Sequence, residues 1–252
     1  MKKKILFNIM VYIEFIIFLS SNISAYKVNN QTKTHFNKTL FQSQELPSDD
    51  KVDVFNSIIK NTHSKTVQYG VTAQFNTSDS KEKIVNELFY KLNKDKKLTK
   101  DFSSNKENYS LNFKGKSVSG YIESTRYDNY NIVKIDIVKQ NNIYAINELN
   151  QQMHSILEEF SHHIKYFQYV KVKVLNGSVE ETYDKVIKTL NSIGNNGIRT
   201  DSLQNGYTST TCTGQYKRIY SNGEPVDFNF AVVKYSTGVY IIMGTPEIME
   251  TY

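Results

Sequence analysis

The same arrangement of apolar residues occurs twice in this chain. Alternating apolar residues at 71–75 reappear 99 positions later at 170–174, and the helical spacing at 88–92 reappears 98 positions later at 186–190. Tyr127 stands before a turn in the first half, as Tyr235 does in the second. A period near 100 residues is too long for a solenoid repeat. The pattern therefore indicates two copies of one α+β unit.

Each copy is predicted to run helix, strand, helix and then three strands. The first copy covers residues 49–140, with Asp49 and Asp50 as caps of the first helix and Ser78 or Ser80 as the start of the second. Its elements are expected at 49–61, 67–75, 80–92, 107–114, 117–126 and 130–139.

The second copy covers residues 141–252. Its elements are expected at 144–163, 170–174, 179–190, 205–218, 226–235 and 238–245. Helices should cover one face of an antiparallel sheet in each copy. We expect the two sheets to join edge to edge across a pseudo-two-fold axis, because no Gly/Pro-rich linker separates the copies. Residues 49–252 would then form one body, and two separate lobes are the alternative.

The N-terminus has the layout of a secretory signal peptide. Three lysines precede an apolar run from Ile5 to Leu19, and small residues lead to a cleavage position after Ala25. The run is shorter than the roughly 20 residues of a spanning helix, although an uncleaved membrane tether is the alternative. Residues 1–25 are therefore predicted to be removed, and the polar segment 26–48 is predicted to be a flexible arm.

Composition excludes several classes of protein. The chain has 11 glycines and 3 prolines in 252 residues, too few for collagen-like or Pro/Gly-rich disordered chains. Its single cysteine rules out an intrachain disulfide framework and a cysteine-based zinc knuckle. The net charge of +6 falls to +4 when residues 1–25 are removed, so nucleic acid is not an expected partner.

Four segments of the C-terminal third form a recognisable pattern: Gly206-Tyr207, the hairpin 221–224, the strand 228–235 and the ending 244–252. In these segments the chain resembles the YwmB family of secreted proteins from Gram-positive bacteria, although Glu247 replaces the expected apolar residue. It implies a fold like that of the TATA-box-binding protein, with two similar α+β halves and a curved antiparallel sheet. It implies no DNA binding, because a shared fold does not carry function with it.

Two groups of residues are candidates for chemistry. His154, Glu158 and His162 recur every four residues on the predicted helix 144–163, opposite its apolar stripe, and we interpret them as solvated surface and not as a metal site. Cys212, with Arg218 and the pair His162 and His163, resembles the catalytic set of sortases, but Ser209 replaces the leucine of that pattern. We interpret Cys212 as a structural strand residue.

The last hairpin is apolar on both of its faces, whereas helices can cover only one. Tyr207, Tyr235 and Tyr240 are therefore candidate residues of a binding face, unless another part of the chain covers it.

The favoured function is a non-enzymatic binding or scaffolding protein at the cell envelope, without catalytic residues, metal or cofactor. Its expected partner is an envelope polymer or protein. A wall-acting enzyme that uses Cys212 and a nucleic-acid-binding protein are the alternatives.

Overall fold

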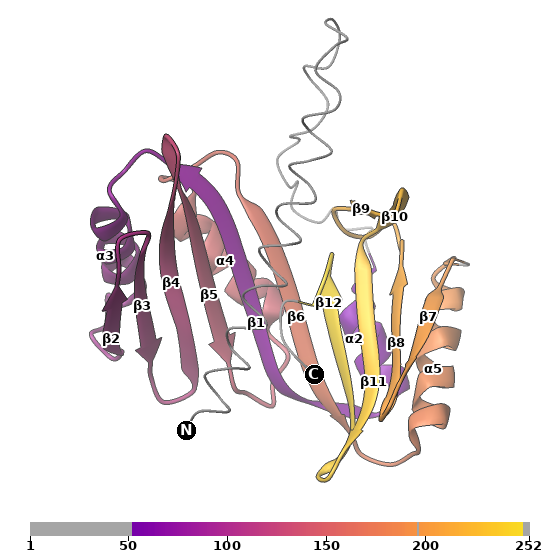
Figure 1. Cartoon of the computed structure of the whole chain (residues 1–252). Coiled ribbons are helices and arrows are strands. Elements are labelled where there is room, and N and C mark those ends of the chain that lie inside the picture. The colour runs from indigo at the N-terminus through magenta and orange to yellow at the C-terminus, as the bar shows by residue number, and fades with distance from the viewer. Residues whose placement is uncertain (1–51, 196, 249–252) are drawn as a thin grey trace, which may run out of the picture. The chain divides into compact units, whose positions relative to one another are not determined.

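The computed structural model describes residues 52–195 and 197–248. Several predicted features lie outside these ranges: the signal peptide 1–25, the arm 26–48, the proposed caps Asp49 and Asp50, and residues 249–252 of the ending that resembles the YwmB family. The described chain is an α+β protein (Figure 1). Its four helices are α2 (Val54–Asn61), α3 (Lys81–Leu92), α4 (Ile146–Leu157) and α5 (Val179–Ser192).

Ten of the described strands form one antiparallel sheet, in the order β2-β3-β4-β5-β1-β6-β12-β11-β8-β7. Strands β9 and β10 form a separate pair beside it. The central neighbours β1 and β6 come from the two predicted copies, so a single sheet includes strands of both. The strands are β1 (Ser64–Thr77), β2 (Thr99–Ser104), β3 (Asn108–Lys114), β4 (Val118–Tyr127), β5 (Tyr130–Lys139), β6 (Lys165–Val174), β7 (Arg199–Leu203), β8 (Gly206–Thr211), β9 (Ile219–Ser221), β10 (Glu224–Val226), β11 (Phe228–Tyr235) and β12 (Gly238–Thr245).

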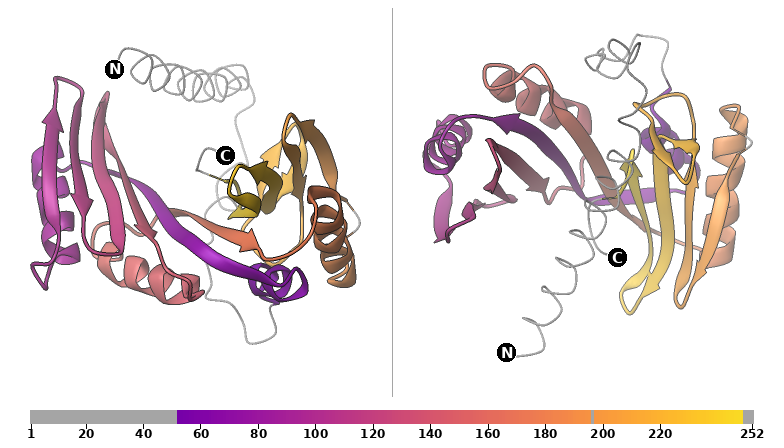
Figure 2. Two further views of the ribbon diagram at one scale, coloured as in Figure 1. Left: turned by 90° about the horizontal axis from the view of Figure 1, so that it is seen from below. Right: turned by 45° about the horizontal axis from the view of Figure 1, so that its top comes forward.

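All four helices lie against the same face of the sheet (Figure 2). Helix α3 packs on β3 and β4, α4 on β1, α2 on β1 and α5, and α5 on β8 and β11. The main core lies between this helical layer and the inward-facing strand residues, among them Val71, Val172 and Val232, which are fully buried. The opposite face, which we call the open face, carries no helix of the described chain.

Side-chain caps define where three of the helices begin. Ser80 and Ser178 accept hydrogen bonds from the backbone N–H groups of Lys83 and Glu181, and Ser178 forms a complete capping box with Glu181. Helix α2 starts later than predicted, at Val54, because Asp53 is the residue whose carboxylate accepts from Asn56 N–H.

The edge strands β2 and β7 were not predicted. Every residue of β2 is exposed, and β7 is exposed except at Leu203. An edge strand with solvent on both faces has no alternation of apolar and polar residues, so the sequence pattern predicts a loop there. Each copy therefore contributes four strands after its second helix to the ten-stranded sheet, not three, and the second copy has the separate pair β9 and β10 in addition.

The predicted helix 144–163 is too long at both ends. Helix α4 ends at Leu157, and Phe160 and Ser161 donate to the Leu157 carbonyl in the turn that follows. The chain must reverse within a few residues to enter β6 at Lys165, where it pairs with β1. The pairing of β6 with β1 therefore ends the helix at Leu157, although residues at helical apolar spacing continue to Ile164.

Strand β1 also departs from the predicted alternation. A bulge between Thr66 and Gln68 interrupts its pairing with β6 and leaves Val67 39% exposed, although Val67 was predicted to share the buried face of Val71. Beyond the bulge, Val71, Ala73 and Phe75 face the core as expected.

Candidate functional site

A second apolar cluster lies on the open face, away from the main core. Side chains alternate between the two faces of a strand, so Val232 and Ile241 belong to the main core while Val233 and Ile242 lie on the opposite side. We call this second group the open-face cluster. It consists of Ala231, Val233 and Ile242, with Leu203, Tyr235, Tyr240 and Ile248 packed against them.

Two tyrosines and two lysines form the outer part of this region. The rings of Tyr235 and Tyr240 meet edge to face, with centroids 5.4 Å apart. The Lys171 ammonium lies 4.9 Å from the Tyr235 centroid and 5.4 Å from that of Tyr240, and Lys173 lies 5.9 Å from Tyr240. These are cation–π distances, so the two aromatic rings help to position both ammonium groups.

Tyr207 does not belong to this face, contrary to the prediction. It pairs with Val232 in the β8–β11 ladder and packs on the main core, with its ring 4.8 Å from that of Tyr183. The prediction grouped the three tyrosines because both faces of the hairpin read as apolar. Only the strand register separates Tyr207 from Tyr235 and Tyr240.

The C-terminal segment folds back over part of the open face. A Cβ atom at Gly244 would lie 2.6 Å from the Glu247 carbonyl oxygen, and Ile248 packs on the open-face cluster. Burial raises the pKa of the half-buried Glu247 carboxyl above its usual value. The aliphatic residues Ala231, Val233 and Ile242 are consequently buried, and tyrosine and lysine side chains form the accessible surface.

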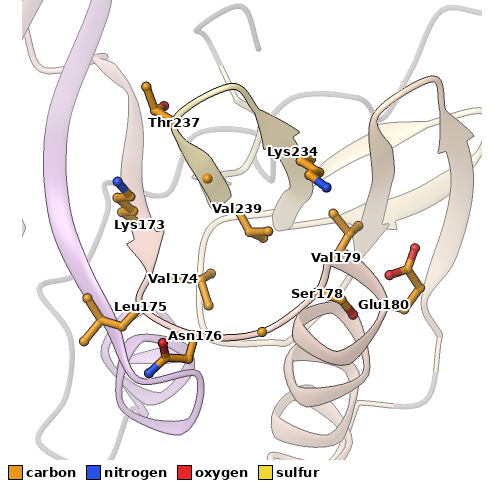
Figure 3. Close-up of a pocket in the computed structure, with 12 residues that line it drawn as sticks. Lys173, Val174, Leu175, Asn176, Ser178, Val179, Glu180, Lys234, Thr237 and Val239 are labelled. Carbon is orange, nitrogen blue, oxygen red and sulfur yellow. The ribbon is translucent and has the colours of Figure 1, made fainter.

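A cavity of about 470 Å³ adjoins Lys173 at the start of α5 (Figure 3). Lys173 and Lys234 stand on two sides of it, Thr237 lies at its upper rim, and Ser178 and Glu180 lie on the helix below. The capping box already engages the N–H groups of Ser178 and Glu181. The cavity is a hollow beside the lysine and tyrosine surface, and the Ser178 side chain occupies the Glu181 N–H in the first turn of the helix.

The histidine ladder predicted on one helix is not formed. His154 lies in α4, Glu158 is its C-terminal cap residue and His162 lies beyond the helix. His154 stacks on Tyr166 and lies 3.8 Å from the Glu158 carboxylate, with both side chains largely exposed. Within the described part of the chain, no group of three or more His, Cys, Asp or Glu residues is arranged to hold a metal ion.

Cys212 is half-buried and lies one residue beyond the end of β8. The prediction that it is a strand residue is therefore wrong by one position. His162 and His163 precede β6, and β12 and β11 lie between β6 and β8 in the sheet. Three strand spacings separate the two positions by about 14 Å. A thiol and its general base need contact at roughly 3 Å, so this geometry does not bring Cys212 and these histidines together.

Two buried carboxyl groups escaped the sequence analysis. Asp227 is fully buried and accepts from the backbone N–H of Thr213 at 2.6 Å and from the Thr213 hydroxyl at 3.0 Å, which orders the loop after β8. Asp136 is 6% exposed and accepts from the Thr72 hydroxyl at 2.6 Å. Burial raises the pKa of Asp136, and both groups have structural partners.

The comparisons with known proteins give no family. No protein-family model matches the sequence, and no curated protein matches it. Among the described helices, none is long and apolar enough to cross a membrane.

Sequence reasoning missed Lys171 and Lys173. The alternating valines of residues 170–174 predict the strand, and these valines face the core. The intervening positions were the available signal, because alternate residues of a strand occupy its other face.

Proposed function

We propose that this chain is a non-enzymatic, extracytoplasmic binding protein of the bacterial cell envelope, of the YwmB type. The signal-peptide-like N-terminus supports the compartment. The residues of the last hairpin and its Gly-Thr-Pro ending support the family. Catalysis by Cys212 is less favoured because three strand spacings, about 14 Å, separate its place in the sheet from that of the candidate histidines.

We also propose that the fold is a tandem duplication resembling the TATA-box-binding protein. The N-cap serines Ser80 and Ser178 are 98 residues apart, the same interval as between the matched apolar residues of their helices. The strand order is symmetric about the β1–β6 pair, with β5 and β12 as the next neighbours. Tyr127 and Tyr235 end corresponding strands, β4 and β11. A curved sheet with two similar halves would account for all three observations.

The single observation that carries the binding function is the lysine and tyrosine surface on the open face. It consists of Lys171, Lys173, Tyr235 and Tyr240 around a buried aliphatic base. Half-exposed tyrosines with ammonium groups at their rings are typical of recognition surfaces, because both residue types offer polar and apolar contacts. The corresponding strands of the first copy, β4 and β5, also carry a lysine beside a tyrosine, with the Lys134 ammonium 5.4 Å from the Tyr121 centroid, but they place Glu123 and Asp136 on the same open face. The strands β6, β11 and β12 contain no aspartate or glutamate, and this difference in charge favours the second copy as the binding half.

The experiment is a sedimentation assay of the secreted protein with purified cell walls. The intact walls carry their attached polymers, and a second sample is stripped to peptidoglycan. We expect the wild-type protein to sediment with at least one of these fractions. The variant Tyr235→Ala/Tyr240→Ala should lose this retention, while Tyr207→Phe, on the helical face, should keep it. Absence of the wild-type protein from every envelope pellet would contradict the proposal.

A further inference from the structure

Five adjacent strands of the sheet, β1, β6, β12, β11 and β8, contain no aspartate or glutamate. They carry five lysines. Lys234 lies on the helical side, since its neighbours Val233 and Tyr235 belong to the open-face cluster. The four on the open face are Lys65, Lys165, Lys171 and Lys173. The strands in the middle of this face therefore carry positive charge and no carboxylate of their own, while the half-buried Glu247 lies in the C-terminal segment that covers part of the face.

Three of these lysines are crowded together. Lys65 and Lys173 are direct partners in the β1–β6 ladder, and Lys171 is two residues from Lys173 on the same face. Like charges directly opposite each other across a ladder destabilise a sheet. Among the residues that the structure describes, no carboxylate forms an ion pair with any of the three. The fold gains cation–π contacts for Lys171 and Lys173 but, within the described chain, no ion pair that would neutralise the three charges, so the arrangement points to an external anion.

The two tyrosines hold the ammonium groups and do not form a stacking platform. Lys171 lies over both rings, at 4.9 and 5.4 Å from their centroids, and the rings meet each other at 65°. The Tyr240 hydroxyl lies 3.0 Å from the Thr237 hydroxyl, which fixes the ring further. Stacking of a nucleobase needs a free ring face. The surface is thus better suited to anionic groups than to aromatic bases.

The spacing of the lysines suits a chain of anions. Lys171 and Lys173 are separated by about 7 Å along the strand, and Lys65 lies across the ladder at about 5 Å. Lysine is a compact point charge that binds phosphate oxygens without the planar geometry that arginine demands. A linear polymer with several phosphates can contact all three lysines at once.

We propose that Lys65, Lys171 and Lys173 form a binding site for a phosphodiester polyanion without bases, namely a polyol-phosphate polymer of the envelope. This inference rests on the proposed envelope-binding function and names its ligand class. The polymer would lie over the β1, β6 and β12 strands, with its phosphates against the lysines. Its apolar backbone carbons would contact the edges of Tyr235 and Tyr240.

The test measures the binding of purified poly(glycerol phosphate) to the secreted protein at several salt concentrations. Uncharged dextran, poly(glutamate) and a single-stranded DNA oligonucleotide serve as comparison polymers. The variant Lys171→Gln/Lys173→Gln should bind poly(glycerol phosphate) roughly tenfold more weakly, with a shallower salt dependence. Lys188→Gln removes an exposed lysine from helix α5, on the helical side of the sheet, and should bind as the wild type does. Lys171→Arg/Lys173→Arg should retain binding, because it keeps both charges.

Several results would overturn the inference. Equal binding of the Lys171→Gln/Lys173→Gln variant would remove these lysines from the site, provided that its thermal unfolding matches the wild type. If that variant fails to fold, Lys65→Gln, at an exposed position, replaces it and should weaken binding by a smaller factor. Tighter binding of DNA or poly(glutamate) would assign the surface to another ligand class. Retention on walls stripped of phosphate polymers would overturn this ligand assignment alone, whereas absence from every envelope fraction would overturn the proposed function as well.

Discussion

The Tyr144 hydroxyl donates to the Asp53 carboxylate, lying 3.1 Å from Oδ1 and 3.0 Å from Oδ2. Asp53 is also the N-cap of α2, so one carboxylate joins the start of this helix to the segment before α4. Burial, and then the charge of Asp53, raise the pKa of Tyr144 above its ordinary value, which keeps the hydroxyl protonated and able to donate.

Replacement of Asp53 by Ala should destabilise the protein by about 1 to 2 kcal/mol, because it removes the cap and leaves the Tyr144 hydroxyl without its acceptor. Tyr144→Phe should cost about 1 kcal/mol or less, since Asp53 still accepts from Asn56 N–H. Urea unfolding of both variants measures the difference. Asp95→Ala, in the exposed pair with Lys97, is the control and should change stability by less than about 0.5 kcal/mol. A larger effect for Tyr144→Phe than for Asp53→Ala would contradict this account.

Asp136 should make stability fall as pH rises. Burial raises its pKa in the folded chain above the ordinary value of 3.8, despite the hydrogen bond from Thr72 and the charge of Lys134. The folded state therefore binds this proton more tightly than the unfolded state. The free energy of unfolding decreases as pH rises above 3.8, because the buried Asp136 carboxyl must then ionise. Asp136→Asn should accordingly unfold at a higher temperature than the wild type at pH 7, with a gain that shrinks toward pH 3. Thermal unfolding at several pH values tests this, and a constant difference would refute it.

Gly206 should not tolerate a side chain. It pairs with Val233 at the start of β8, and a Cβ atom there would overlap the backbone carbonyl oxygen of Val232. Gly206→Ala should therefore destabilise the protein by about 1 to 3 kcal/mol, because a backbone atom must move. The matched control is Gly197→Ala, where a Cβ atom has no neighbour within 4 Å. Comparable unfolding midpoints for the two variants would show that the β8–β11 register differs from the one described.

The assignment of the tyrosines to two faces predicts different consequences for their removal. Tyr235→Ala/Tyr240→Ala removes the rings that position Lys171 and pack on the open-face cluster, so we expect weaker binding to envelope polymer together with some loss of stability. Tyr207→Ala should destabilise the fold by about 2 to 4 kcal/mol, because its ring packs on Tyr183 and the main core. Paired binding and unfolding measurements on the two variants test the assignment. Reversed effects would mean that Tyr207 is the surface residue.

Cys212 should be dispensable for binding. The thiol lies outside the strand ladder and far from His162 and His163, so Cys212→Ala leaves the lysine and tyrosine surface intact. We expect Cys212→Ala to retain wall binding and to restore the wild-type phenotype in a deletion strain. Loss of the phenotype with unchanged wall binding would support the alternative of a wall-acting enzyme that uses this cysteine.

The elements that depend on local signals were predicted well. Helices α3 and α5 follow from apolar residues at helical spacing and from serine caps, and β11 and β12 follow from their hairpin turn. The edge strands β2 and β7 were missed because their pairing, and not a buried face, makes them strands. The long helix was overextended because the turn after Leu157 is imposed by the entry into β6.

The candidate site was predicted only in part, for a related reason. Tyr235 and Tyr240 lie together on one face, and their part in binding stays a prediction, whereas Tyr207 lies on the opposite face and Lys171 and Lys173 were missed. Alternation along one strand says which residues share a face, but not which face the helices cover when both are apolar.

The sequence by itself determined the α+β fold class, most of the helices and strands, and the turns between them. Caps, periodicity and turn residues act over a few positions, so a local pattern is enough to predict these elements. Only the tertiary structure decided that β1 lies beside β6, that Lys65 faces Lys173 across this ladder, and that Lys171 lies over two tyrosine rings. These relationships join residues of both halves of the chain. They depend on strand order and register, which long-range packing sets and no local pattern encodes.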